Sequence, residues 1–165
     1  MLQILFLLIQ LGFVIYLLYM CIAFISGAPF VPTNPASAHA MIRLANMKAG
    51  MRVYDLGSGD GKLLLLAARQ GARAIGYEIN PLLVLFSNLK TLGIAVTYWK
   101  NFWNADISDA DVICVYLLPT RMEKLETKLK KECKKGTLIV SNSFIFPHWK
   151  ILRQDAANHI YVFRV

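Results

Sequence analysis

Residues 54–62 read YDLGSGDGK, with glycines at 57, 59 and 61 and acids at 55 and 60. Glycine loses more conformational freedom on folding than any other residue, so this density indicates backbone that turns tightly or lies against another molecule. The preceding MRVYDL is typical of a strand, and the following KLLLLAARQ of a buried helix that ends at Gly71. The segment therefore predicts a strand, a glycine loop and a helix, with a ligand at the carboxyl end of the strand.

The rest of the chain after Met51 alternates short apolar runs with helical patterns. This alternation predicts right-handed βαβ units and an α/β fold with an open, mainly parallel, Rossmann-like sheet. An earlier helix is expected over ASAHAMIRLANM, capped by Thr33 or Asn34 with Pro35 in its first turn. Further strands are expected at 73–79, 94–99, 111–118 and 137–144, further helices at 81–93 and 120–136, and HIYVFRV forms the tail.

The N-terminal residues 1–26 contain no Asp, Glu, Lys or Arg. As a helix they would be about 39 Å long, which exceeds the ~30 Å hydrocarbon core of a bilayer. A signal peptide would have a basic start and a shorter apolar run, and a buried core helix is the other alternative. The pattern favours a transmembrane helix at 1–26, a linker at 27–35 and a folded domain at 36–165.

The first formal charge is Arg43, and the chain carries 18 basic and 10 acidic residues, a net charge of +8. The positive-inside rule therefore predicts a single-pass membrane protein whose folded domain lies on the cytoplasmic side or its matrix equivalent. The excess positive charge is compatible with nucleic acid or with anionic lipid beside the anchor, and nucleic acid is not the expected partner. Part of the charge should form a basic surface, which is read as a solvated helix face with contact to anionic lipid headgroups as the alternative. Its residues are Lys124, Lys128, Lys130, Lys131, Lys134 and Lys135.

Two common nucleotide-binding patterns are absent from the sequence. The dinucleotide motif G-x-G-x-x-G needs a small residue at position 62, where the chain has Lys62, and no phosphate-binding G-x-x-x-x-G-K-[ST] string occurs. The three cysteines lack CxxC spacing and the three histidines lack metal-ligand spacing. We therefore expect reduced, structural cysteines and no metal.

The spacing D-x-G-x-G-x-G, with Glu78 at the end of the second strand, resembles the class I S-adenosylmethionine-dependent methyltransferases. A carboxylate at Glu78 can accept hydrogen bonds from ribose hydroxyls. The resemblance implies that the glycines approach the methionine part of the cofactor and that Asp55 orients its ammonium group. A turn without a ligand is the alternative for the glycine loop.

The motifs PFVPT, GYEINPLLV and FIFPHW, spread over residues 29–150, are similar to the small membrane-anchored lysine methyltransferases. Known members modify the ATP synthase c-subunit and the adenine nucleotide translocase. The resemblance implies that Thr33 closes over the cofactor and that Asn101 and Phe102 lie near the adenine, although an acid is expected before this aromatic residue. The implied cofactor-binding set is Thr33, Asp55, Gly57, Ser58, Gly59, Asp60, Gly61, Glu78, Asn80, Asn101 and Phe102.

Methyl transfer to lysine needs alignment and a deprotonated amine, because an ordinary lysine pKa of ~10.4 leaves the amine charged at neutral pH. An apolar pocket favours the neutral form, so no dedicated base is required. Tyr116, at the carboxyl end of the strand at 111–118, is the candidate that positions the substrate, and a core aromatic is its alternative reading. Substrate contacts are expected from Leu118, Pro119, Trp103, Phe146 and Trp149, of which the aromatic residues can equally be packing residues.

The leading hypothesis is a membrane-anchored methyltransferase that acts on a lysine of a membrane protein, with S-adenosylmethionine as the methyl donor and S-adenosylhomocysteine as the product. Tethering would raise the effective concentration of such a substrate. One alternative is methylation of a small molecule, lipid or RNA. The other is a non-catalytic cofactor-binding or scaffold protein in the membrane.

Overall fold

The structure, a computed structural model, describes residues 2–26 and 31–165, and within the first helix the side chains of residues 2–18 and Cys21. Residues 27–30 of the predicted linker lie outside the described residues. The chain divides into two compact units, residues 1–31 and 32–165.

Helix α1 (Leu2–Ser26) forms the first unit, and its sequence carries no charge in its first or last turn. Its described apolar side chains, from Leu2 to Leu18, are all largely exposed. Across the described part of the chain, no helix has both the length and the apolar character needed to cross a membrane. The span expected at 1–26 therefore stays a prediction.

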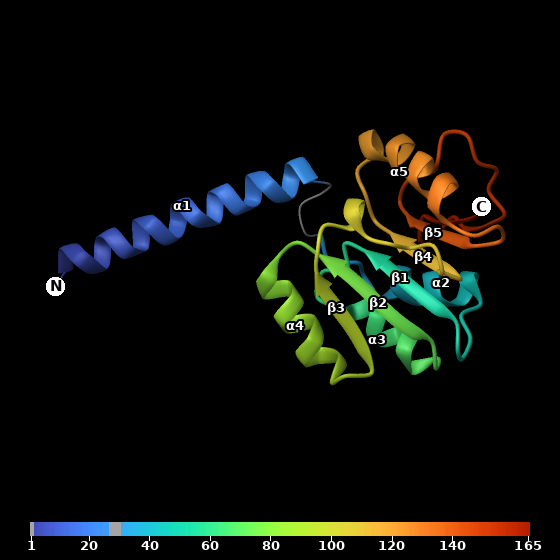
Figure 1. The fold of residues 1–165 in the computed structure, drawn as a ribbon, viewed down its shortest axis with the longest axis horizontal. Helices are drawn as coiled ribbons and strands as arrows, with labels where there is room; N and C mark the ends of the chain where they lie inside the picture. Colours follow the sequence, from blue (N-terminus) through green and yellow to red (C-terminus); the bar gives the residue numbers. More distant parts are fainter. Residues whose placement is uncertain (1, 27–30) are drawn as a thin grey trace. The chain divides into compact units, whose positions relative to one another are not determined.

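The second unit is built on a seven-stranded sheet with the order β3-β2-β1-β4-β5-β7-β6 (Figure 1). The first five strands pair in parallel, and β7 and β6 are added antiparallel at one end. The expected open, mainly parallel sheet is therefore confirmed. The strands are β1 (Arg52–Leu56), β2 (Arg73–Glu78), β3 (Ala95–Trp99), β4 (Val112–Val115), β5 (Leu138–Asn142), β6 (Arg153–Asp155) and β7 (Ile160–Arg164).

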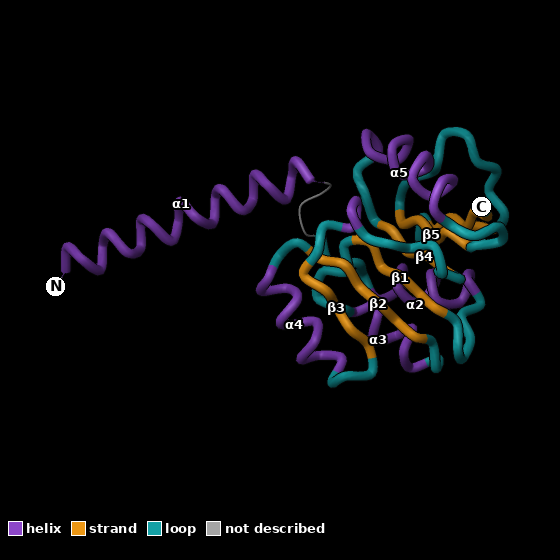
Figure 2. The backbone as a smooth tube through the Cα atoms, viewed as in Figure 1, coloured by secondary structure: helices purple, strands orange, loops and turns teal. Residues whose placement is uncertain are grey.

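Helices connect the parallel strands along the chain (Figure 2). Asn34 caps α2, and its side chain accepts a hydrogen bond from the Ser37 N–H, so it and not Thr33 is the cap. The helices of this unit are α2 (Pro35–Ala45), α3 (Lys62–Arg69), α4 (Pro81–Thr91), α5 (Pro119–Glu132) and the short 3-10 helix η1 (Phe102–Asn104).

The sheet has a separate hydrophobic core on each face, because successive strand residues point to opposite sides. On one face, Val53, Ala74 and Cys114 pack with the buried side chains of α2 and α3. On the other face, Leu56 and Ile113 pack with the buried side chains of α5. This three-layer arrangement exposes only the strand ends and connecting loops to a ligand.

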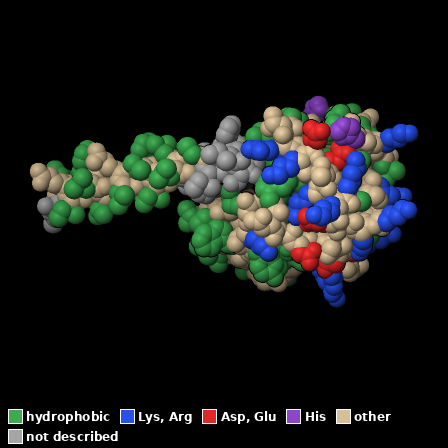
Figure 3. Space-filling model, turned by 45° about the horizontal axis from the view of Figure 1, so that its top comes forward, with side chains coloured by type: hydrophobic (Ala, Val, Ile, Leu, Met, Phe, Trp, Pro, Cys, Tyr) green, Lys and Arg blue, Asp and Glu red, His purple; other side chains and the backbone are tan. Residues whose placement is uncertain are grey.

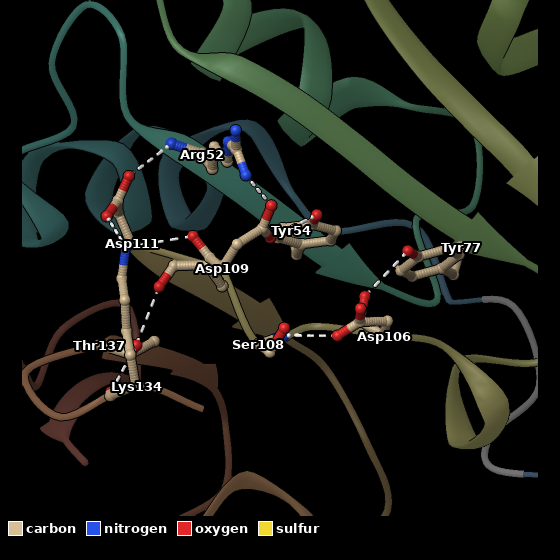
Figure 4. Close-up of polar contacts among 10 residues, drawn as sticks. Arg52, Tyr54, Tyr77, Asp106, Ser108, Asp109, Asp111, Lys134 and Thr137 are labelled. Atoms are coloured by element: carbon tan, nitrogen blue, oxygen red, sulfur yellow. Dashed lines mark hydrogen bonds and ion pairs between the residues drawn. The ribbon is translucent and has the colours of Figure 1, made fainter. Parts of the chain in front are cut away.

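The loop between β3 and β4 closes the second face over β1 and β2 (Figure 4). Tyr54 and Tyr77 stack with ring centroids 5.9 Å apart. The Tyr54 hydroxyl donates to Asp109, and the Tyr77 hydroxyl donates to the Asp106 carbonyl. Burial raises the pKa of both tyrosines, so they remain neutral donors at physiological pH and tie this loop to the sheet.

Three details differ from the sequence-based expectations. Strand β4 ends at Val115, so Tyr116 lies beyond the strand, while β6 and η1 were not predicted. The predicted basic surface loses Lys128, which is buried and donates to the Ala105 carbonyl at 3.1 Å and to Glu132. Lys130 and Lys134 pair with Glu126 and Asp111, so part of the predicted basic surface is compensated by neighbouring acids.

Candidate active site

The chain reverses its direction across the sheet at β1, which lies between β2 and β4. After β1 it proceeds outward to β2 and β3, and it then returns to the other side to form β4. Ligands of open α/β sheets bind outside the carboxyl ends of the strands at such a switch point. The glycine loop of residues 57–61 follows β1 at this position.

The glycine loop adopts backbone angles that side chains disfavour. Gly57, Gly59 and Gly61 have φ values of 91°, 54° and 72°. The N–H groups of Gly57 and Ser58 both donate to the Tyr77 carbonyl, so the loop folds back onto β2. A Cβ atom at Gly61 would lie 2.1 Å from the Ser87 hydroxyl oxygen, which explains glycine at this position.

Glu78 is fixed at the end of β2 by three backbone donors. Its Oε2 accepts the Gly59 N–H at 2.9 Å, and its Oε1 accepts the N–H groups of Ile79 and Asn80 at 2.8 Å. Only 8% of Glu78 is exposed. The carboxylate thus joins the glycine loop to the start of α4.

Asp55 is the second buried carboxylate of the site, and it is also 8% exposed. Burial raises its pKa from 3.8 to about 7, with further contributions from the negative charges of Glu78 and Asp60. Its partner across the strand pair is Cys114, whose thiol pKa is raised by burial and by Asp55. A cation beside Asp55 would therefore lower its pKa and stabilise the charged carboxylate.

Asp60 lies on the outer side of the loop and is neutralised by lysine. Lys90 donates to its Oδ2 at 2.7 Å, and the Lys62 N–H donates to its Oδ1 at 3.2 Å. Although burial opposes the effect, these hydrogen bonds lower the pKa of Asp60. The Lys62 ammonium donates to the Thr33 carbonyl at 2.5 Å, which places the segment before α2 beside the glycine loop.

Ser58 occupies the inner side of the loop, against β2. Its hydroxyl oxygen is buried and has no hydrogen-bond partner among the described residues. A Cβ atom at Gly76 would lie 2.5 Å from this oxygen, so the glycine in β2 makes room for the loop. Gly76 was not among the predicted site residues, and its only signal in the sequence is a glycine within a strand.

The three remaining predicted cofactor residues lie where β2 and β3 end, but their side chains have structural partners. Asn80 caps α4 by accepting from the N–H groups of Leu82 and Leu83. Asn101 caps η1 by accepting the Trp103 N–H, and Phe102 is buried beside the Trp103 ring. The Lys100 N–H donates to the Glu78 carbonyl, so this turn adjoins Glu78. The predicted adenine contacts of these residues stay predictions.

A polar pocket of about 190 Å³ lies beyond the ends of β4 and β5. Two of its residues, Ser143 and His159, have φ values of 69° and 54°, which side chains other than glycine rarely adopt. The sequence analysis identified Thr33 and Tyr116 as site residues but missed the other lining residues. The polar run SNSF at the end of a strand, which contains Asn142 and Ser143, is a weak signal of such a site. The lining residues are Pro32, Thr33, Asn34, Ser37, Tyr116, Asn142, Ser143, Ala157, Asn158 and His159.

The predicted substrate residues are divided between the helix start and the core. Leu118 precedes α5 and Pro119 begins it. Phe146 is buried, packing edge to face with Phe163 at 5.1 Å. The lysines Lys124 and Lys130 lie 4.6 and 5.8 Å from the ring centroids of Trp103 and Trp149, respectively. Lysines of the same chain thus face these two rings, which favours a structural role.

In the described part of the chain, no group of three or more His, Cys, Asp or Glu side chains is close enough to hold a metal ion. The strand order and the glycine-loop site define a class I methyltransferase fold. Residues 55–153 match the ANTKMT methyltransferase domain, and the chain belongs to this family.

Two relatives and one solved structure extend this assignment. The chain is 32% identical to the human ATP synthase c-subunit lysine N-methyltransferase over 73% of its own length and 54% of that protein. It is 34% identical to a protein-lysine N-methyltransferase of Saccharolobus islandicus, over 77% of its own length and 83% of that protein. The crystal structure of an RNA methyltransferase from Salinibacter ruber with S-adenosylhomocysteine aligns with a TM-score of 0.76 and 34% identity. The alignment covers 81% of this chain and 92% of that chain.

The chain therefore spans about half the length of its human relative, and most of the length of the archaeal one.

Proposed function

We propose that this chain is an S-adenosylmethionine-dependent methyltransferase that acts on a lysine of a membrane protein. The observation that carries the proposal is the Glu78 carboxylate, which the Gly59 N–H holds at 2.9 Å beside the switch point of the sheet. The lysine specificity is supported by relatives that are named as lysine methyltransferases.

The residues of the site fit an S-adenosyl group. A carboxylate offers about four acceptor positions, and Glu78 already uses three of them for backbone donors. About one position therefore remains, on Oε2, for a ribose hydroxyl. The buried Asp55, with its pKa raised to about 7, matches an ammonium group, because a cation would stabilise its charged form.

When bound, S-adenosylmethionine supplies a methyl group on a positively charged sulfur, ready for in-line attack by a nucleophile. The glycine loop offers its backbone to the cofactor, because Gly57, Gly59 and Gly61 have no side chain that would block a close approach. Lys62 holds the Thr33 carbonyl against this loop, and Thr33 also lines the polar pocket. The segment before α2 thus connects the cofactor side with the acceptor side.

We assign the polar pocket as the place where the substrate amine is positioned. Its lining contains Tyr116, Asn142 and His159 but no acidic residue. Because no carboxylate lines the pocket, no negative charge there stabilises the ammonium form, and the lysine can lose its proton to water before attack. Tyr116 is the residue that we propose for positioning the amine.

We further propose that residues 1–26 anchor the chain in a bilayer. The support is a charge-free sequence and a helix of 25 residues, about 37 Å long. All formal charges follow from Arg43 onward, which favours the cytoplasmic or matrix-equivalent side for the catalytic unit. Resistance of the full chain to carbonate extraction from membranes would support this anchor, and its release would exclude it.

Two experiments on the full chain in detergent test the enzymatic proposal. Calorimetric titration with S-adenosylhomocysteine should show binding, whereas NAD and ATP should not bind. Membrane extract and methyl-labelled S-adenosylmethionine should then give label on lysine, and the Glu78→Gln variant should give much less label at a cofactor concentration that does not saturate it. Binding without transfer to any fraction would leave a non-catalytic cofactor-binding protein.

Methylation of RNA is the second candidate function. It is favoured by the net charge of +8 and by the likeness to a solved structure described as an RNA methyltransferase. The same labelling experiment separates the two candidates when protein, lipid and RNA fractions are counted individually. Label confined to RNA would replace the lysine assignment.

A further inference from the structure

Helix α4 packs with its polar side toward the sheet, which reverses the usual arrangement of a helix in a globular domain. Ser87 and Thr91 are fully buried between α4 and β3. The Ser87 and Thr97 hydroxyls lie 2.5 Å apart, and Asn88 exchanges two hydrogen bonds with the Thr97 backbone. The polar side of the helix is therefore satisfied within the protein.

The opposite side of α4 carries four large apolar side chains. Leu82, Leu85, Phe86 and Leu89 have the i, i+3, i+4, i+7 spacing of one helix face, and each is 55–64% exposed. Leu92 and Trp99 extend this surface past the helix and along the edge strand β3, and we call the six residues the α4 face. Hydrophobic side chains gather on this part of the unit in the space-filling view (Figure 3).

The backbone at Leu92 supports a functional origin for this surface. Leu92 has a φ of 47° at the end of α4 and is 86% exposed. Glycine or asparagine is usual in this left-handed position, and a bulky residue there is strained. Neither burial nor an easy backbone conformation therefore accounts for leucine at this position.

We propose that the α4 face lies in the interfacial region of a lipid bilayer with anionic headgroups. Exposed basic residues lie on α4 and at the neighbouring strand ends: Arg73 at the start of β2, Lys90 on α4, and Lys100 after β3. Lys90 is paired with Asp60, and the remaining nearby acid, Glu78, is buried. An apolar face with a basic border and a tryptophan at its edge matches a membrane interface.

The same charges disfavour a second copy of this chain on the α4 face. A twofold contact would bring the basic borders of the two copies together, and like charges would oppose it. Anionic lipid would instead be attracted by them. Since α4 begins directly after Glu78 and Asn80, this contact would bring the cofactor side of the site close to the membrane surface.

Lipid contact can be tested with the full chain in vesicles of phosphatidylcholine and phosphatidylglycerol. An environment-sensitive fluorophore is placed at Leu89→Cys, or at Lys131→Cys on α5 as the control, with Cys21 and Cys133 replaced by serine. Brominated acyl chains should quench the label at position 89 at least threefold more than the label at 131. Leu85→Cys provides a second labelling position if the first one perturbs folding.

Equal and weak quenching at positions 89 and 131 would overturn the proposal, as would a chain that does not bind the vesicles. A label at 89 that is shielded from water but not quenched by brominated lipid would also overturn it, because protein would then cover the face. Phe86→Glu should reduce the quenching at 89 at least twofold, whereas Ile145→Glu, at an equally exposed apolar position, should not. Carbonate extraction and calorimetry test the anchor and the enzymatic function separately.

Discussion

The ends of β1 and β2 and the ends of β4 and β5 lie along the same edge of the sheet, but they are built in different ways. The first region consists of glycines and two buried carboxylates, of which Glu78 is held by three backbone donors. The second is a polar pocket without an acidic residue in its lining, and its residues come from distant parts of the chain. The first region thus offers rigid backbone and negative charge to a cationic cofactor, whereas the second offers polar groups to an amine without a carboxylate that would favour its charged form.

The titration of Asp55 gives the largest expected effect. Its pKa is 3.8 when unfolded and about 7 when folded, so the folded chain keeps a proton that the unfolded chain releases. The contribution of Asp55 to the free energy of unfolding is fully present below about pH 4 and decreases as the pH rises from about 4 to about 7. The decrease is at most ~1.4 kcal/mol per pH unit and on the order of 4 kcal/mol in total. Asp55→Asn should remove this fall in urea unfolding between pH 5 and 8.

The control for this experiment is Asp60→Asn, because the pKa of Asp60 is lowered and its titration contributes in the opposite direction. Parallel pH curves for the wild type and Asp55→Asn would contradict the assignment. Binding of S-adenosylhomocysteine near pH 6.5 should release protons from Asp55, which calorimetry detects as a different heat in phosphate and in imidazole buffer.

Replacement of Gly61 by alanine should have the next largest effect. The new Cβ would strain a φ of 72° and clash with Ser87, which we expect to lower the free energy of unfolding by about 3 kcal/mol. Gly93→Ala is a matched control, since its φ is 82° and nothing lies within 4 Å of its Cβ. It should cost about 1 kcal/mol. Equal losses in the two variants would show that the loop is not tightly packed.

Glu78→Gln should weaken the affinity for S-adenosylhomocysteine by about 30-fold, or ~2 kcal/mol, because charge-assisted hydrogen bonds are lost. It should also reduce stability, since an amide group would face backbone donors at the end of β2. The control is Glu126→Gln, another buried carboxylate, which accepts from the His148 N–H and pairs with Lys130. It should lose stability without any change in affinity.

Tyr116→Phe should have the smallest effect and should separate the two regions. We expect methyl transfer to slow by about tenfold, equivalent to ~1.4 kcal/mol, with unchanged affinity for S-adenosylhomocysteine. Tyr98→Phe, on the edge strand, should leave both quantities unchanged. A loss of cofactor affinity in Tyr116→Phe would show that the polar pocket belongs to the cofactor side.

Local sequence signals predicted the elements around the glycine loop well. The prolines and asparagines that begin α2 and α4 act through residues two to four positions away, so they are readable without a fold. Strand β6 was missed because RQD is short and polar, and it is a strand only through its pairing with β7. Lys128 was misplaced because its partner, the Ala105 carbonyl, lies 23 residues away in the chain.

By itself, the sequence determined the strand–glycine loop–helix unit, the position of Glu78 at the end of β2, and the charge-free N-terminal segment. These features depend on residue type and short-range spacing, which are fixed before the chain folds. Only the tertiary structure decided that Thr33, Tyr116, Asn142 and His159 line one pocket, and that α4 turns its leucines outward. Both features depend on packing between elements that are far apart in the chain, and no local pattern specifies such packing.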